Sequence, residues 1–223
     1  MSEKDKYEFD CSKKVITLGT SGVGKSCILR RYSDNIFDEK VFTTIGLSVI
    51  LKEIKLKNGK NITLKLIDTA GQEKYKALSK SYFKNVDAVL FIFSINSDTS
   101  FEDVITWIDL FNENYNGKSN IPQYLVGNKL DLERNVSKEM VNEFINENMK
   151  YKYFETSAKD NIGIKELFED LAENLYKIHI KENTKKKSQN TYILKNINPK
   201  KENKCIMCNS TSDLDSNYHK SRD

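Results

Sequence analysis

The sequence lacks a long apolar run. Its longest uninterrupted apolar segment is six residues, Ala88 to Phe93, whereas a helix needs about 20 to cross a bilayer. The first residues, Met1 to Asp5, contain no apolar stretch of the kind that secretory signals carry, and position 2 is a serine rather than the glycine that myristoylation requires. We therefore expect a cytoplasmic protein with no transmembrane helix.

Cysteine is also scarce. Cys11, Cys27, Cys205 and Cys208 are too few and too unevenly spaced for a disulfide framework, which agrees with a reducing compartment. Cys205 and Cys208 form a single C-x-x-C that could pair with His219, but a structural zinc site needs a fourth ligand. Inert thiols and lipid attachment are the alternatives for these two cysteines, and no standard prenylation box follows them.

Positive charge is concentrated in the last part of the chain. Residues 181–223 carry ten Lys and Arg against five Asp and Glu, whereas residues 1–180 are nearly neutral. The basic segment has little apolar content, so we expect a disordered tail at 181–223, after an N-terminal extension at 1–11 and one globular domain at 12–180. Its lysines favour reversible association with an anionic membrane. A solvated tail without a membrane role is the alternative.

The first strong motif lies where a strand gives way to a helix. Lys14 to Leu18 is a short buried-strand pattern, and residues 19–26 then match G-x-x-x-x-G-K-[ST] before a helical pattern begins. In such a loop, successive backbone N–H groups surround phosphate oxygens. Lys25 would contact the β- and γ-phosphates and the Ser26 hydroxyl would bind Mg²⁺. The alternative is a glycine-rich turn without a ligand.

Strand and helix patterns alternate along the rest of the globular part. The expected strands are Leu47–Leu56 and Ile62–Ile67, joined at Asn58-Gly59, and then Ala88–Ile95, Gln123–Gly127 and Tyr153–Thr156. The expected helices are Phe101–Phe111, Val136–Met149 and Ile164–Ile178. This order predicts a mainly parallel sheet with helices on both faces and a ligand at the carboxyl ends of the strands.

Three further motifs follow predicted strands. Asp68 ends an apolar strand, where a carboxylate can hold Mg²⁺, and the backbone N–H of Gly71 can reach a γ-phosphate. Asp131, in Asn128-Lys129-Leu130-Asp131, can accept the two N–H donors of guanine, although this short string is weak evidence in an Asn- and Lys-rich chain. Ala158 can donate its backbone N–H to the guanine carbonyl, and the stems of Lys129 and Lys159 can cover the ring. A polar loop is the alternative for this last motif.

A fourth motif, Thr43-Thr44-Ile45-Gly46, lies in a polar loop. Together with the others it suggests that the Thr44 hydroxyl completes a Mg²⁺ shell when a γ-phosphate is present.

In this order and spacing the motifs resemble those of the Ras superfamily of small GTPases, and the Rab branch most of all. Ser21, Tyr82-Phe83-Lys84 and a Phe37 expected to stack on the purine favour Rab. The resemblance implies a three-layer P-loop GTPase fold: six strands, mostly parallel with one antiparallel edge strand, and helices on both faces. It also implies GTP and GDP with Mg²⁺ as ligands, and two loops, about 37–46 and 68–82, that become ordered around the γ-phosphate.

The resemblance assigns roles to individual residues. Gln72 would orient the attacking water, with Lys25 stabilising phosphate charge. The expected Mg²⁺ ligands are Ser26, Thr44 and Asp68. The expected nucleotide-binding residues are Ser21, Gly22, Val23, Gly24, Lys25, Ser26, Cys27, Phe37, Thr44, Gly71, Asn128, Lys129, Asp131, Ser157, Ala158 and Lys159.

The effector surface is expected to include Ile45, Gly46, Val49, Ile67 and Tyr82. Two of the three positions that carry aromatic rings in Rab proteins are aliphatic here, namely 49 and 67. This departure changes the partners that such a surface can select.

The sequence therefore predicts a monomeric switch that hydrolyses GTP to GDP slowly and regulates vesicle traffic on the cytoplasmic face of an intracellular membrane. An exchange factor, an activating protein that supplies an arginine, and effectors are the expected partners, and no nucleic acid is expected. The alternatives are a GTP-locked binding module, a cytosolic small GTPase of another branch, and a P-loop kinase or ATPase, against which Asp131 argues.

Overall fold

The computed structural model describes residues 11–39, 44, 47–69, 82–118 and 120–197, and for 186–197 it describes the backbone alone. The chain divides into two compact units, residues 1–182 and residues 183–223. The first unit holds every strand among the described residues.

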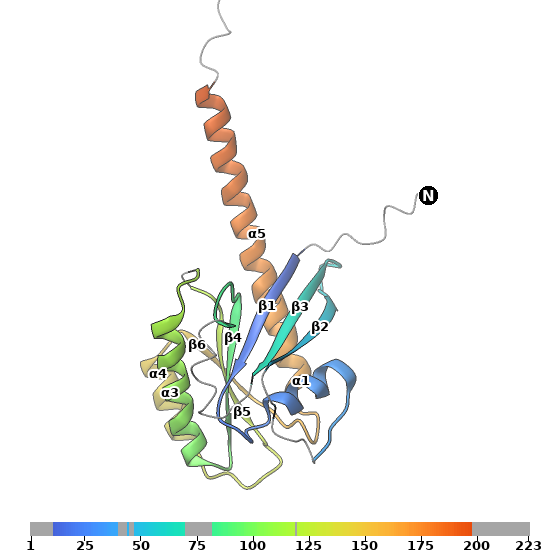
Figure 1. Ribbon diagram of the computed structural model, residues 1–223, viewed down its shortest axis with the longest axis vertical. Helices are drawn as coiled ribbons and strands as arrows, with labels where there is room; N and C mark the ends of the chain where they lie inside the picture. Colours follow the sequence, from blue (N-terminus) through green and yellow to red (C-terminus); the bar gives the residue numbers. More distant parts are fainter. Residues whose placement is uncertain (1–10, 40–43, 45–46, 70–81, 119, 198–223) are drawn as a thin grey trace, which may run out of the picture. The chain divides into compact units, whose positions relative to one another are not determined.

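Six strands form one sheet in the described part of the chain (Figure 1). They are β1 (Cys11–Leu18), β2 (Leu47–Lys55), β3 (Asn61–Thr69), β4 (Ala88–Ser94), β5 (Gln123–Asn128) and β6 (Tyr151–Glu155), in the spatial order β2-β3-β1-β4-β5-β6. Only the β2–β3 pair is antiparallel, and its strands are joined by the expected hairpin. The predicted sheet is confirmed, with a single antiparallel strand at its edge.

Helices cover both faces of this sheet. They are α1 (Lys25–Asp34), α3 (Asp98–Asn114), α4 (Lys138–Glu147) and α5 (Ile164–Ile197). One core cluster contains Ile28 of α1 and Phe168 of α5, and a second contains Trp107 of α3 and Val141 of α4. All seven residues of β4 are buried between these two layers, which agrees with the uninterrupted apolar pattern of the first six. Figure 1 shows α3 and α4 together on one side of the sheet and α1 on the other.

The expectation that regular structure ends near residue 180 is wrong. Helix α5 continues to Ile197, so residues 181–197 are helical. Two physical reasons account for the difference: the helix is already nucleated by its buried first part, and five of the 17 residues in the segment are lysine, which is a good helix former. Residues 198–223, with Cys205, Cys208 and His219, lie outside the described part. Within the described part, no helix is both long enough and apolar enough to span a bilayer.

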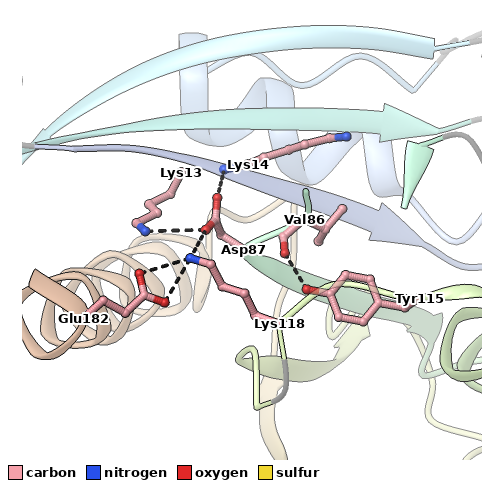
Figure 2. Close-up of polar contacts among 7 residues, drawn as sticks. All are labelled: Lys13, Lys14, Val86, Asp87, Tyr115, Lys118 and Glu182. Carbon is pink, nitrogen blue, oxygen red and sulfur yellow. Dashed lines mark hydrogen bonds and ion pairs between the residues drawn. The ribbon is translucent and has the colours of Figure 1, made fainter. Parts of the chain in front are cut away.

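A charged cluster joins the amino ends of the strands to α5 (Figure 2). The Asp87 carboxylate, just before β4, accepts a hydrogen bond from the backbone N–H of Lys14 at 3.0 Å and faces the ammonium of Lys13 at 3.4 Å. Lys118 lies 3.6 Å from Asp87 and 2.9 Å from Glu182 of α5. Since the glycine-rich loop leaves the other end of β1, this cluster lies at the edge of the sheet opposite the candidate site.

We expect Asp87→Asn to lower the free energy of unfolding by about 1–3 kcal/mol. The Lys13 side chain is 7% exposed, so its ammonium would lose a charged partner that water cannot replace. Urea titration of the purified chain measures this change. Glu182→Gln is the matched control: it removes a partner of Lys118, whose side chain is 53% exposed, and should cost less than about 1 kcal/mol. Equal losses in both variants would contradict the role given to Asp87.

Candidate functional site

The glycine-rich loop between β1 and α1 packs directly against neighbouring main chain and side chain. A Cβ on Gly19 would lie 2.1 Å from the backbone oxygen of Ile92, and a Cβ on Gly24 would lie 2.3 Å from Nδ2 of Asn128. Gly24 has φ of 96° and precedes the first residue of α1. Glycine at these two positions therefore permits the close packing that places the start of α1 next to the carboxyl ends of β4 and β5.

Lys25 is buried within this loop. Its Nζ donates to the backbone oxygens of Gly19 at 2.8 Å and Thr20 at 2.9 Å. Burial lowers the pKa of Lys25 to about 8, and the carboxylate of Asp68 opposes this effect. An ammonium held by carbonyl oxygens in a poorly solvated position is well suited to bind a phosphate, because an anion offsets the cost of its desolvation.

Three oxygen-bearing side chains gather beside Lys25. Ser26 Oγ donates to Asp68 Oδ2 at 2.6 Å and lies 2.8 Å from Thr44 Oγ1. Burial raises the pKa of Asp68, and the Ser26 hydrogen bond and the Lys25 charge act in the opposite direction.

The cluster has the donor atoms that a cation needs. Asp68 Oδ1 is buried and receives no hydrogen bond from any residue that the structure describes. A carboxylate oxygen without a donor, next to two hydroxyls, is the donor set that a small hard cation such as Mg²⁺ prefers. Ser26, Thr44 and Asp68 therefore fit the ion that the sequence predicts.

The opposite end of the site is held together by Asn128. Its Nδ2 donates to the backbone oxygen of Val23 at 2.8 Å, and its Oδ1 accepts from Thr156 Oγ1 at 3.1 Å. The backbone N–H of Leu130 donates to the oxygen of Thr156 at 3.0 Å. Asn128 therefore ties three segments together: the glycine-rich loop, the end of β5 and the loop after β6.

Asp131 is oriented by one of its neighbours. Ser157 Oγ donates to Asp131 Oδ1 at 2.6 Å and in turn accepts from the backbone N–H of Asp160 at 3.0 Å. Asp131 lines the candidate cavity, whereas Ser157 is fully buried behind it. One carboxylate oxygen is thus fixed by Ser157, which leaves Oδ2 as the acceptor for a ligand.

A cavity of about 380 Å³ connects the phosphate end to the Asp131 end. Most of the expected nucleotide-binding residues line it: Ser21, Gly22, Gly24, Lys25, Ser26, Cys27, Phe37, Thr44, Asn128, Lys129, Asp131, Ala158 and Lys159. Val23 and Ser157 do not line it, because each is buried behind the wall and supports it through Asn128 or Asp131. Gly71 and Gln72 lie outside the described residues.

Some wall residues were not expected from the motifs. Asp38, Glu39, Thr69 and Leu132 also line the cavity. Glu39 forms an ion pair with Lys159 at 2.9 Å, although both side chains are well exposed. Thr69 directly follows Asp68, and Leu132 directly follows Asp131. Their positions next to these motif residues could have identified them as cavity residues from the sequence.

The expected effector surface is only partly exposed. Val49 on β2 is 46% exposed and Tyr82 is half-buried, but Ile67 on β3 is 2% exposed and belongs to the core cluster that contains Phe83. The expectation that Ile67 contributes surface is wrong in this structure, because β3 is covered on both faces from Leu66 onward. Ile45 and Gly46 lie outside the described residues.

Comparison with known proteins gives a consistent result. The family model described as the Ras family matches residues 14–177. Rab-10 of Diplobatis ommata is 36% identical over 179 residues, which cover 79% of this chain and 88% of that protein. Rab-9A of Canis lupus familiaris is 36% identical over 160 residues, covering 70% and 79% respectively. Rab-13 of Rattus norvegicus is 30% identical over 202 residues, covering 89% and 98%.

Proposed function

Because the chain belongs to the Ras family of small GTPases, we propose that it is a Rab-type switch that binds GTP and GDP with Mg²⁺ in the described cavity and regulates intracellular membrane traffic. The single observation that best supports the proposal is the pairing of a buried Lys25 with the Ser26–Thr44–Asp68 oxygen cluster. A phosphate chain with its cation would satisfy both the ammonium and the free oxygen of Asp68.

Each residue of the site has a proposed task in GTP hydrolysis. Lys25 binds the β- and γ-phosphates and stabilises charge that develops on them. Ser26, Thr44 and Asp68 would hold Mg²⁺, which would neutralise phosphate charge. Gln72 orients the attacking water. The transferred phosphoryl group needs little covalent chemistry from the protein, so positioning and charge stabilisation account for most of the catalysis.

Thr44 gives the proposed switch its sensitivity to the nucleotide. In the described structure its hydroxyl lies 2.8 Å from Ser26 Oγ and 3.5 Å from Asp68 Oδ2, within reach of the same cation. Loss of the γ-phosphate would weaken this arrangement and favour a second loop conformation. An exchange factor, a GTPase-activating protein and effectors would each recognise one of the two states, and the protein would act as a monomer on the cytoplasmic face of a membrane.

The proposal is tested by single-turnover phosphate release from the full chain loaded with GTP and Mg²⁺. Slow release of one phosphate per protein, faster with an activating protein, is the expected result. Tight binding of GTP with no release over many hours would favour a GTP-locked binding module. Preference for ATP over GTP would overturn the proposal altogether.

Gln72→Leu should slow single-turnover hydrolysis by about 10²-fold, because water would no longer be held in line with the γ-phosphate. Affinity for GTP and GDP should not change, since Gln72 is not proposed to bind either one. Phosphate release at fixed protein concentration measures the rate, and equilibrium titration with a fluorescent GDP measures the affinity. A normal hydrolysis rate in this variant would remove Gln72 from the mechanism.

Membrane attachment is a separate part of the proposal. Intact-mass measurement of the protein purified from its native cell distinguishes the two outcomes. A prenyl or palmitoyl adduct on Cys205 or Cys208 would support a membrane switch. An unmodified chain that does not sediment with anionic vesicles would contradict the membrane role and leave a cytosolic switch.

A further inference from the structure

Arg31, near the end of α1, makes four hydrogen bonds within the described residues. Its Nε donates to the backbone oxygen of Ala158 at 2.7 Å and its Nη2 to that of Lys159 at 3.0 Å. Its Nη1 donates to the backbone oxygen of Asn35 at 3.0 Å and to the Asn35 side-chain oxygen at 3.3 Å. The guanidinium also lies over the Phe37 ring, 5.8 Å from its centroid. One side chain thus contacts two loops that are far apart in the sequence.

The backbone of Ala158 is held in place by contacts on both its amino and its carboxyl side. On its amino side, Ser157 is fixed by one hydrogen bond to Asp131 and by its backbone pairing with Ile162 at 3.0 Å in both directions. On its carboxyl side, the planar guanidinium binds two successive carbonyls, at 158 and 159. Ala158 N–H therefore has its direction set from both sides, which a charge without fixed donor geometry could not achieve.

The other side of the guanidinium restrains the segment after α1. Asn35 has a left-handed backbone with φ of 57°, ends the helix, and donates its N–H to the oxygen of Arg31 at 3.1 Å. Arg31 binds the Asn35 carbonyl in return and covers the Phe37 ring. Phe37 and Ala158 both line the cavity at the end that holds Asp131.

We infer that Arg31 is a positioning residue for the guanine base: it holds Ala158 N–H and the Phe37 ring in the places where the base is bound, without touching the nucleotide itself. The inference rests on the proposed function, because it needs guanine in this part of the cavity. It predicts that Arg31 controls how long the nucleotide stays bound and how sharply oxygen 6 of guanine is recognised.

The test combines a change in the protein with a change in the base. Dissociation rates and equilibrium constants are measured for GDP and for 6-thioguanosine diphosphate, which keeps the two nitrogen donors facing Asp131 and replaces oxygen 6 by a larger and weaker acceptor. In the unmodified chain the thio substitution should weaken binding. Arg31→Ala should release GDP about tenfold faster, and its affinity loss on thio substitution should be at least threefold smaller than that of the unmodified chain.

Two further variants separate positioning from charge and from folding. Arg31→Lys keeps the positive charge but cannot bind both carbonyls of the loop, so it should behave like Arg31→Ala. Arg30→Lys is the matched control for Arg31→Lys: Arg30 is exposed on the same helix and its charge acts on Asp68, so lysine keeps that charge while the arginine geometry is lost. It should release GDP at the unmodified rate. Single-turnover hydrolysis should also be unchanged in the Arg30 variant.

The outcomes separate failure of the inference from failure of the function. If the unmodified chain does not bind GDP, or binds both diphosphates equally well, guanine recognition through Ala158 is wrong and the inference falls with it. If the unmodified chain discriminates and Arg31→Ala discriminates to the same degree, Arg31 is a structural residue and the inference alone is overturned. Full discrimination in Arg31→Lys would also overturn it, since charge would then suffice.

Discussion

Asp131→Asn is expected to change the base preference of the chain from guanine to xanthine by about 10⁴-fold in relative affinity. The structure indicates which atom changes. Ser157 Oγ donates to Asp131 Oδ1 at 2.6 Å, and asparagine keeps an oxygen at that position. The new amide nitrogen therefore replaces Oδ2, the atom that would face the base in the proposed complex. The amide N–H groups cannot bond to the N–H donors of guanine, because both sides are donors. They can donate to the carbonyl that xanthine has in place of guanine's amino group.

Competition between GDP and xanthosine diphosphate for the purified protein measures this change in base preference. Ser157→Ala is the informative companion variant, because it leaves the Asp131 carboxylate intact and removes the hydrogen bond that fixes it. It should weaken GDP binding while guanine stays preferred. If Asp131→Asn binds both diphosphates poorly and equally, Asp131 supports the loop rather than selecting the base.

Local sequence was sufficient where a motif and a buried strand lie together. Asp68 is the next-to-last residue of β3 and Asn128 is the last of β5, and since both strands run parallel in one sheet, their carboxyl ends meet at the same edge. The 3.6-residue apolar repeat that begins at Ile164 predicted the buried part of α5, because an apolar stripe of this period packs against a sheet. These elements needed no information from distant segments.

The structure differs from expectation where distant segments decide the outcome. The burial of Ile67 depends on both layers that cover β3, and its own strand pattern does not reveal them. Arg31 lies 127 positions before Ala158, and nothing in either segment signals their hydrogen bond. Helix propagation beyond residue 180 was missed because composition describes an isolated segment, whereas residues 181–197 extend a helix already formed.

The two ends of the cavity are linked through α1. Ser26, at its first turn, belongs to the oxygen cluster, and Arg31, near its last turn, holds the loop that contains Ala158. A helix is a stiff connection, so a nucleotide held at both ends would fix the spacing between its base and its phosphates. This explains how separate motifs of moderate strength can act as one binding site: each restrains the position of the next.

Lys25→Met is expected to lower GDP affinity by about 10²-fold to 10³-fold, because a buried ammonium would no longer meet the β-phosphate while the methionine stem still fills the space. Lys25 also donates to the carbonyls of Gly19 and Thr20, so its loss could act through the loop alone. Binding of GMP separates the two effects, since GMP lacks the β-phosphate but needs the same loop. If Lys25 acts on phosphate, the variant and the unmodified chain bind GMP with similar affinity and differ only for GDP and GTP. Equal losses for GMP and GDP would instead make Lys25 a support for the glycine-rich loop. The Lys25 charge would then serve only to hold the loop. The lowered pKa of Lys25, about 8, argues for the phosphate role instead, because burial without a ligand disfavours the charged form.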